Sequence, residues 1–407
     1  MPITNLSPFN RLFATASGVQ AADQIAYAAI PITVVLALGG GPGLVGLLLA
    51  AQTAAWLIVS LPAGVIVDRL DRRAIFITAL CLSLAASLAA ALAAALGSVW
   101  LLGLAVFLGA SGTVTFVLVQ IGLVQTLIEG PELPRANARI ELARATAICF
   151  APFGVGWLAT TVSPLAGYPL AAVFALVALG FGLTVPVPPR SGETKTQQSP
   201  LQAIVYGARF VLAEPLLRAI GLCAIFWNFA FVALAAAFVP FALSRLGTDV
   251  AGAGLVQGAS GVGMILGALT APALFARAQP RFFLVFGPIV SALAAFFLVI
   301  APAGGGLPLA AVAYFLIGFG PMLWLVMQTS IRQLVTPGEV MGRVTATIQV
   351  AIYGVRPIGA LIGGFVGQVY GVDAAMILVL SAFTASAAAA LFSPLAQVRE
   401  MPSRQSA

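Results

Sequence analysis

The sequence predicts an all-α integral membrane protein with twelve transmembrane helices. The first observation is composition: 61% of the 407 residues are hydrophobic and 8% are charged, with a mean hydropathy of +1.08. These values exclude a water-soluble domain of this length. The second is that the apolar residues fall into segments of about twenty residues or more, the length that a helix needs to cross about 30 Å of hydrocarbon. The third is that polar and apolar residues do not alternate, as they would in strands of a membrane barrel.

The predicted spans follow one another along the chain with short connectors. Their approximate ranges are 11–38, 43–67, 74–95, 99–128, 137–162, 165–186, 216–243, 249–276, 281–301, 306–335, 342–370 and 373–396.

One long connector divides these spans into two groups of six. We therefore expect an N-terminal six-helix half at residues 1–186, a cytoplasmic linker at 187–215 and a C-terminal six-helix half at 216–407. Pro, Ser, Thr and Gln gather in the linker, a composition typical of a flexible tether. Residues 199–213 within it are expected to form a short amphipathic helix on the cytoplasmic surface.

The distribution of basic residues orients the chain. If both termini and the even-numbered loops are cytoplasmic, every Lys and Arg lies inside except Arg144, Arg245 and Arg356. The positive-inside rule selects this topology. The net charge of +7 then reflects orientation and contact with anionic lipid, and it gives no reason to expect nucleic acid as a partner. Residues 1–10 lack the basic start and cleavage site of a secretory signal, so we expect the first span to be retained.

A dense group of charges follows the second span, in "PAGVIVDRLDRR" at residues 62–73. Its arginines can anchor the loop at the cytoplasmic headgroups, while Asp68 ends the span where a carboxylate can meet a helix N-terminus or an arginine. A simple topology anchor would explain the arginines but not the acids, which contribute little to orientation. The candidate latch motif consists of Gly64, Asp68, Arg69, Arg72 and Arg73.

In its spacing this loop resembles the signature G-x-x-x-D-R-x-G-R-R of the major facilitator superfamily, with Asp71 where the family usually has its second glycine. The resemblance implies the fold of that superfamily and a secondary transporter in which Asp68 latches the two halves together when the outward side is open. Four further stretches resemble the drug and siderophore export branch, which includes macrolide efflux proteins and the enterobactin exporter. They are "SGVQAADQIAYAAIP", "ELPRANARIELAR", "QTSIRQLVTPGEVMGRV" and "RPIGALIGG".

The sequence departs from that branch in two places. The fourth span has no arginine, although many proton-coupled drug antiporters of the superfamily have one there. In the fifth span, "APFGVG" has Ala151 and Val155 in place of two glycines of the antiporter motif. Both departures weigh against proton antiport by the best-known route.

Three ionisable residues are predicted to lie deep in the spans: Asp23, Arg144 and Arg356. A charge at the bilayer centre costs at least about 2.5 kcal/mol, so such residues usually face a bundle interior or a water-filled cavity and find partners. Asp23 and an arginine could neutralise each other as a structural pair. Because the chain has no histidine, Asp23 and Glu141 are the obvious membrane-embedded proton carriers, and an aspartate in an apolar cavity can take up a proton near neutral pH. Glu141 and Arg144, three residues apart, are expected to share a helix face and to pair.

Several uncharged polar residues could line a central cavity with these groups. Each alone is more often a helix-packing contact, but together they favour a broad amphipathic pocket. The candidates for proton coupling and the substrate cavity are Asp23, Arg144, Arg356, Gln24, Tyr27, Gln120, Asn228 and Gln328, and Gln52 is a further polar residue of this kind.

The sequence contains no pattern typical of an enzyme. There is no histidine, no nucleophile motif and no G-x-x-x-x-G-K-[ST] phosphate loop, so we expect neither catalysis nor a cofactor, a metal or ATP. We expect a secondary transporter, most simply one that exports small amphipathic compounds such as drugs, siderophores or related metabolites, with protons as the coupling ion. The alternative is a uniporter or proton symporter that imports an organic anion, with Arg144 and Arg356 as its binding groups. A non-transporting scaffold or sensor is a third reading, but no large soluble domain supports it. We expect a monomer in a bacterial inner membrane.

Overall fold

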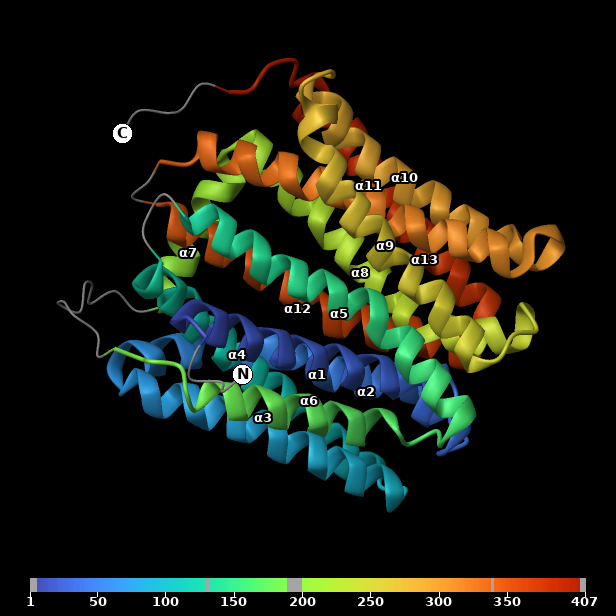
Figure 1. The fold of residues 1–407 in the computed structure, drawn as a ribbon. Helices are drawn as coiled ribbons and strands as arrows, with labels where there is room; N and C mark the ends of the chain where they lie inside the picture. Colours follow the sequence, from blue (N-terminus) through green and yellow to red (C-terminus); the bar gives the residue numbers. More distant parts are fainter. Residues whose placement is uncertain (1–5, 129–131, 189–199, 338–339, 403–407) are drawn as a thin grey trace. The chain divides into compact units, whose positions relative to one another are not determined.

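The computed structural model describes residues 6–128, 132–188, 200–337 and 340–402, and these ranges form helices without a strand (Figure 1). The α-helices are α1 (Pro8–Leu36), α2 (Pro42–Arg69), α3 (Arg72–Ala95), α4 (Val99–Leu127), α5 (Leu133–Thr161), α6 (Gly167–Gly182), α7 (Pro200–Ala213), α8 (Pro215–Arg245), α9 (Val250–Phe275), α10 (Pro280–Ile300), α11 (Gly306–Val335), α12 (Met341–Val369) and α13 (Val372–Leu391).

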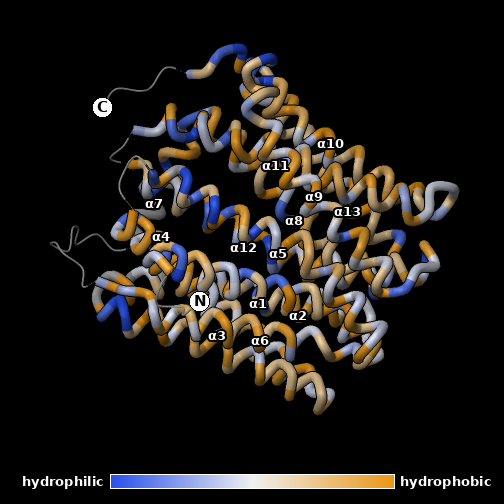
Figure 2. Tube along the Cα trace, in the orientation of Figure 1, coloured by the Kyte–Doolittle hydropathy of each residue, from blue (hydrophilic) through white to orange (hydrophobic). Residues whose placement is uncertain are grey.

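Every predicted span corresponds to one helix, and α7 is the predicted linker helix. In the described ranges, ten segments are long and apolar enough to cross a membrane, and one of them, Pro280–Val335, contains both α10 and α11. The shorter α6 is also apolar, and Figure 2 shows hydrophobic residues along most of the helices. The predicted all-α membrane fold class is therefore confirmed. Two helices end earlier than expected, α6 at Gly182 and α13 at Leu391.

Local sequence explains where many of these helices begin. Proline occupies the first turn of α2, α8 and α10, where its missing N–H would have no intrahelical partner anyway. The turn between α3 and α4 reverses the chain within three residues, and Gly97 at its centre has a φ of 65°. This left-handed conformation favours glycine because it has no Cβ.

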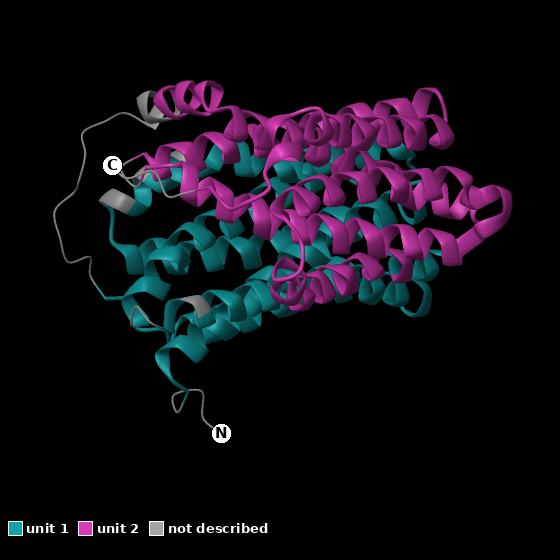
Figure 3. Ribbon diagram, turned by 90° about the horizontal axis from the view of Figure 1, so that it is seen from above, with its two compact units in different colours: residues 1–196, 249–254 teal, residues 197–248, 255–407 magenta. Residues whose placement is uncertain are grey.

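The chain forms two compact units, coloured separately in Figure 3. Unit 1 comprises residues 1–196 and 249–254, and unit 2 comprises residues 197–248 and 255–407. In unit 1, α1 packs against α5 and α6, and α3 packs against α4 and α6. In unit 2, α8 packs against α12 and α13, and α10 packs against α11 and α13. The same neighbours thus recur six spans apart, the arrangement of transporters built from parallel repeats.

The charged loop after α2 contains a helix cap. The carboxylate of Asp71 accepts hydrogen bonds from the backbone N–H groups of Arg73 and Ala74, over 3.2 and 3.1 Å, at the start of α3. An aspartate is among the preferred residues at this position and also suits the positive end of the helix dipole. This role accounts for an acid where the resembled signature has glycine.

The arginines of the same loop differ in their surroundings. Arg72 lies against α4, where a Cβ added at Gly122 would come within 3.0 Å of its Nη2. The exposed Arg73 makes a long hydrogen bond of 3.5 Å to the carbonyl of Leu183. The side chains of Asp68 and Arg69 lie outside the described part of the structure, so the latch stays a prediction.

Arg245, the basic residue that the topology leaves in an outer loop, forms an ion pair with Asp373 at the first turn of α13. Arg245 Nε donates to Oδ1 over 3.0 Å, and Nη2 donates to Oδ2. Both side chains are about half exposed. The Asp373 carboxylate neutralises the charge of Arg245. In the predicted topology Arg245 lies on the outer side of the membrane, where the positive-inside rule leaves few basic residues.

Candidate functional site

Asp23 lies on α1, half-buried among polar groups from three helices of unit 1. Gln24 Nε2 donates to Asp23 Oδ2 over 3.2 Å. Gln52 from α2 and Thr113 from α4 lie close to the carboxylate, and Thr113 Oγ1 donates to the carbonyl of Gly109 over 3.3 Å. No arginine or lysine of the described ranges forms a salt bridge with Asp23, so unit 1 does not contain the structural ion pair that the sequence left open for this carboxylate.

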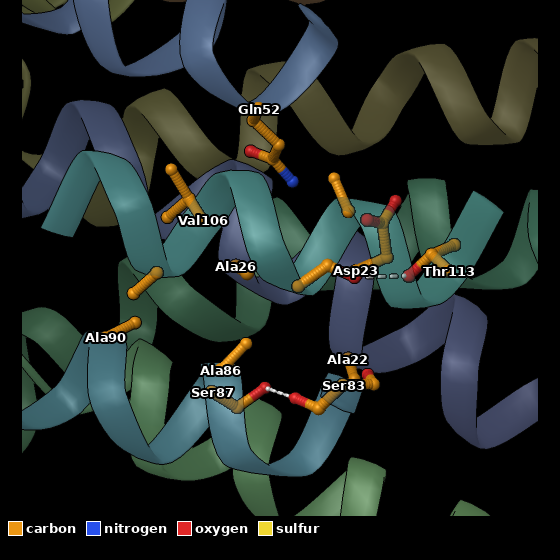
Figure 4. A pocket seen from close by; sticks show the side chains of 13 residues that line it. Ala22, Asp23, Ala26, Gln52, Ser83, Ala86, Ser87, Ala90, Val106 and Thr113 are labelled. Atoms are coloured by element: carbon orange, nitrogen blue, oxygen red, sulfur yellow. Dashed lines mark hydrogen bonds between the residues drawn. The ribbon is translucent and has the colours of Figure 1, made fainter. Parts of the chain in front are cut away.

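A small cavity of about 20 Å³, room for roughly one water molecule, adjoins Asp23 between α1, α2, α3 and α4. In Figure 4, Gln52 points toward Asp23 from one side, and Thr113 lies beside the carboxylate. Ser83 and Ser87 lie on the opposite wall, with Ser87 Oγ bound to the carbonyl of Ser83 over 2.9 Å. The remaining lining is mainly alanine: Ala22, Ala26, Ala86, Ala90, Ala105 and Ala110, with Val106 and Gly109.

The hydrogen bonds around Asp23 suit a carboxyl group in either protonation state. Amide and hydroxyl donors surround it, and these stabilise an ionised carboxylate. Gln52 Oε1 is buried and has no hydrogen-bond partner within the described ranges. A protonated Asp23 could donate to this oxygen after the Gln52 amide rotates, because an amide offers a donor and an acceptor at similar positions. Protonation of Asp23 could therefore give Gln52 Oε1 the hydrogen-bond donor that it lacks in this structure.

The other candidates predicted for unit 1 lie away from this cavity lining. Tyr27 lies one turn beyond Asp23 on α1 and is partly buried. Gln120 is buried on α4, two turns from Thr113, with its Oε1 lacking a partner in the described structure. Neither residue lines the cavity beside Asp23.

Arg144 pairs with Glu141, as the three-residue spacing predicted. Arg144 Nη2 lies 2.7 Å from Glu141 Oε2, and the side chains are 35% and 61% exposed, respectively. The Glu141 carboxylate thus neutralises the charge of Arg144 in this structure, and a role of Arg144 in the cavity stays a prediction.

In unit 2, Arg356 and Asn228 come together from α12 and α8. Arg356 Nε donates to Asn228 Oδ1 over 2.9 Å, and the Tyr353 ring lies 5.2 Å from the guanidinium carbon. Asn228 is buried, and its Nδ2 donates to the carbonyl of Ala224 over 2.9 Å. The sequence indicates both residues as candidates but does not predict that they contact each other.

Gln328 is buried on α11, where its Nε2 donates to Thr329 over 2.9 Å. A separate, small apolar cavity of about 10 Å³ lies in unit 2. Trp227, which lines it, donates from its indole to Ser291 over 3.0 Å. The full lining is Cys223, Trp227, Gly287, Pro288, Pro321 and Trp324.

Sequence reasoning missed the hydroxyl groups of the Asp23 cavity. Ser83 and Ser87 are four residues apart, a spacing that places both on one face of α3. That pattern was the available signal, but a small hydroxyl in an alanine-rich membrane helix is also what simple packing uses.

Comparison with known proteins identifies the family and the fold. The model of the Major Facilitator Superfamily matches residues 12–360, whereas no curated protein sequence matches the chain. Among solved structures, a point mutant of the nucleoside transporter NupG is similar with a TM-score of 0.78 at 12% identity, over 95% of this chain and 98% of that one. A POT family transporter in complex with 5-aminolevulinic acid gives 0.77 at 13% identity, over 96% of each chain.

A bacterial homolog of the human lysosomal transporter Spinster, solved in an inward-facing and unoccupied conformation, gives a TM-score of 0.73 at 15% identity. The match covers 96% of this chain and 98% of that one. At such low identity these structures establish a shared fold.

Proposed function

Because the chain belongs to the major facilitator superfamily and is a membrane transporter rather than an enzyme, we propose that it is a secondary active transporter in which Asp23 carries the coupling proton. The observation that carries this proposal is the half-buried Asp23 carboxylate, which has hydrogen-bond donors around it, a cavity beside it and no salt bridge within the described ranges. A carboxylate that is paired permanently with an arginine stays ionised and does not bind a proton. An acid held by amides and a hydroxyl can do so.

The transported compounds are proposed to be small and amphipathic, such as drugs, siderophores or related metabolites, and the direction is proposed to be export. The support is the resemblance of "SGVQAADQIAYAAIP" and three other stretches to the export branch. Asp23 itself lies in the first of these stretches. We place the protein, as a monomer, in the inner membrane of a bacterium.

Alternating access is the proposed mechanism, with the two compact units as the moving bodies. Gly64, Asp68, Arg69, Arg72 and Arg73 are the proposed latch motif at the cytoplasmic side. Asp68→Asn should leave membrane insertion intact and slow the transport cycle. Unimpaired transport by this variant would reduce the motif to a topology anchor.

The proton-coupling role of Asp23 is tested in proteoliposomes. A screen of macrolides, siderophores and amphipathic organic anions at two pH values first identifies a transported compound, and pH-gradient-driven accumulation of that compound is then compared between wild type and Asp23→Asn. We expect Asp23→Asn to lose accumulation against a gradient while retaining exchange of the compound at equal pH. Asp71→Asn, which changes a carboxylate that caps α3 far from the cavity, is the matched control and should behave as wild type. Accumulation by Asp23→Asn equal to that of wild type would refute the assignment.

A further inference from the structure

We propose that Arg356 and Asn228 form a carboxylate-binding site, and that the transported compound is an amphipathic organic anion held there by its carboxylate group. This inference rests on the proposed transport function and specifies its substrate class. It comes from unit 2, whereas proton coupling is assigned to Asp23 in unit 1.

The charge of Arg356 has no acidic partner within the described ranges. Arg144 pairs with Glu141, and Arg245 pairs with Asp373. Arg356, in contrast, is held by the neutral amide of Asn228. A cation within a membrane span is costly, and such residues are retained where they pair, line a cavity or bind a ligand. A hydrogen bond to an amide leaves the full positive charge available for an anion.

The hydrogen bonds also determine which edge of the guanidinium is available. Asn228 Nδ2 is committed to the carbonyl of Ala224, so Oδ1 is the atom that meets Arg356 Nε. The Nη1 and Nη2 groups make no hydrogen bond to the described structure. These two nitrogens form one edge of a planar fork, and that edge matches the two oxygens of a carboxylate.

Neighbouring groups hold this edge in a defined place. The Tyr353 ring lies against the guanidinium on one side, at a distance typical of a cation–π contact. One turn from Arg356, Gly359 allows α12 to approach α8 so closely that a Cβ there would lie 2.5 Å from the carbonyl of Phe229. Phe229 follows Asn228 in the sequence, so this close approach determines where along α12 the Asn228 amide contacts Arg356. The anion site is therefore preorganised, which lowers the entropic cost of binding.

The site is tested by binding of matched probes to the full-length protein in detergent, at fixed pH and without a proton gradient. The probes are dansylglycine and its neutral amide, and octanoate and octanamide. Binding is followed by dansyl fluorescence and by thermal stabilisation. We expect wild type to bind at least one carboxylate about tenfold or more tightly than its amide, the size of effect expected for a charge-assisted bidentate contact.

Three variants separate this role from a structural one. Asn228→Asp retains the shape of the side chain but gives Arg356 a permanent carboxylate partner, and it should remove the preference for carboxylate probes. Arg356→Lys should keep a reduced preference, because it retains the charge without the planar fork. Arg245→Gln changes an arginine that is paired with Asp373 and lies outside the candidate site, and it should leave the preference unchanged.

The proposal is overturned if no carboxylate binds wild type more tightly than its amide, or if Asn228→Asp keeps the preference. Asp23→Asn should retain the carboxylate preference, since it does not alter unit 2. Failure of the anion site and failure of proton coupling are thus separate results.

Discussion

Gln52 lies beside Asp23 with its carbonyl oxygen Oε1 buried and without a hydrogen-bond partner in the described ranges. Buried polar atoms of this kind are uncommon, and leaving one unsatisfied typically costs about 1–3 kcal/mol. The cost would be recovered when Asp23 is protonated, if the amide rotates and Oε1 accepts the new O–H. We infer that Gln52 helps Asp23 to alternate between its two states.

Gln52→Leu should therefore impair proton-coupled transport more than substrate binding. We expect pH-gradient-driven accumulation to fall about ten- to a hundredfold, because one hydrogen bond to a charged group contributes roughly 1.5–3 kcal/mol. The measurement is accumulation in proteoliposomes beside equilibrium binding. Thr53→Val is the neighbouring control, since the Thr53 hydroxyl donates to the carbonyl of Leu49 on its own helix. Equal accumulation by Gln52→Leu and wild type would contradict this role.

Asp71→Ala should destabilise the protein by about 1 kcal/mol, because it removes the side-chain cap of α3. Asp71→Gly, which restores the glycine of the resembled signature, should cost only a few tenths of a kcal/mol. Thermal unfolding in detergent measures both effects. Asp71→Asn retains a capping oxygen and should stay near wild type. If Asp71→Ala unfolded at the same temperature as wild type, the cap would contribute nothing to the stability of the protein.

Gly359→Ala should destabilise the contact between α8 and α12 by about 1–3 kcal/mol, the usual cost of overpacking. The added methyl group would overlap the carbonyl of Phe229, and backbone cannot move aside as a flexible side chain can. Gly342→Ala is the control on the same helix, because nothing lies within 4 Å of its added Cβ. Since alanine has the higher helix propensity, that control should be neutral or slightly stabilising. Denaturant titration distinguishes the two variants, and similar stabilities would argue against tight packing at Gly359.

Gly207→Val should release the linker helix α7 from α12. A Cβ at Gly207 would lie 2.4 Å from the carbonyl of Arg343 and from Thr347 Oγ1, and Arg343 also lies over the Tyr206 ring. We expect faster amide hydrogen exchange across α7, measured by mass spectrometry. Gly221→Ala, in an open position on α8, is the control. Unchanged exchange in Gly207→Val would mean that other contacts hold the helix.

The helices were predictable because a helix that crosses the hydrocarbon needs a long apolar segment, and such segments can be recognised directly in the sequence. Asp23 was also predictable, since an acid in such a segment is conspicuous. The partnership of Arg356 with Asn228 was not, because nearly uniform apolar helices carry little periodicity from which to determine their rotation. The pairing of Arg144 with Glu141 was predictable, because residues three apart on a helix lie on one face.

The alanine-rich wall of the Asp23 cavity bears on how this protein could change over generations. Each alanine that lines it lies on α1, α3 or α4 and contributes only a methyl group, so a single replacement by a somewhat larger residue would reshape the space while leaving Gln24, Gln52 and Thr113 in place. Substitution at these alanines could then change the space beside Asp23 separately from the polar groups that surround the carboxylate.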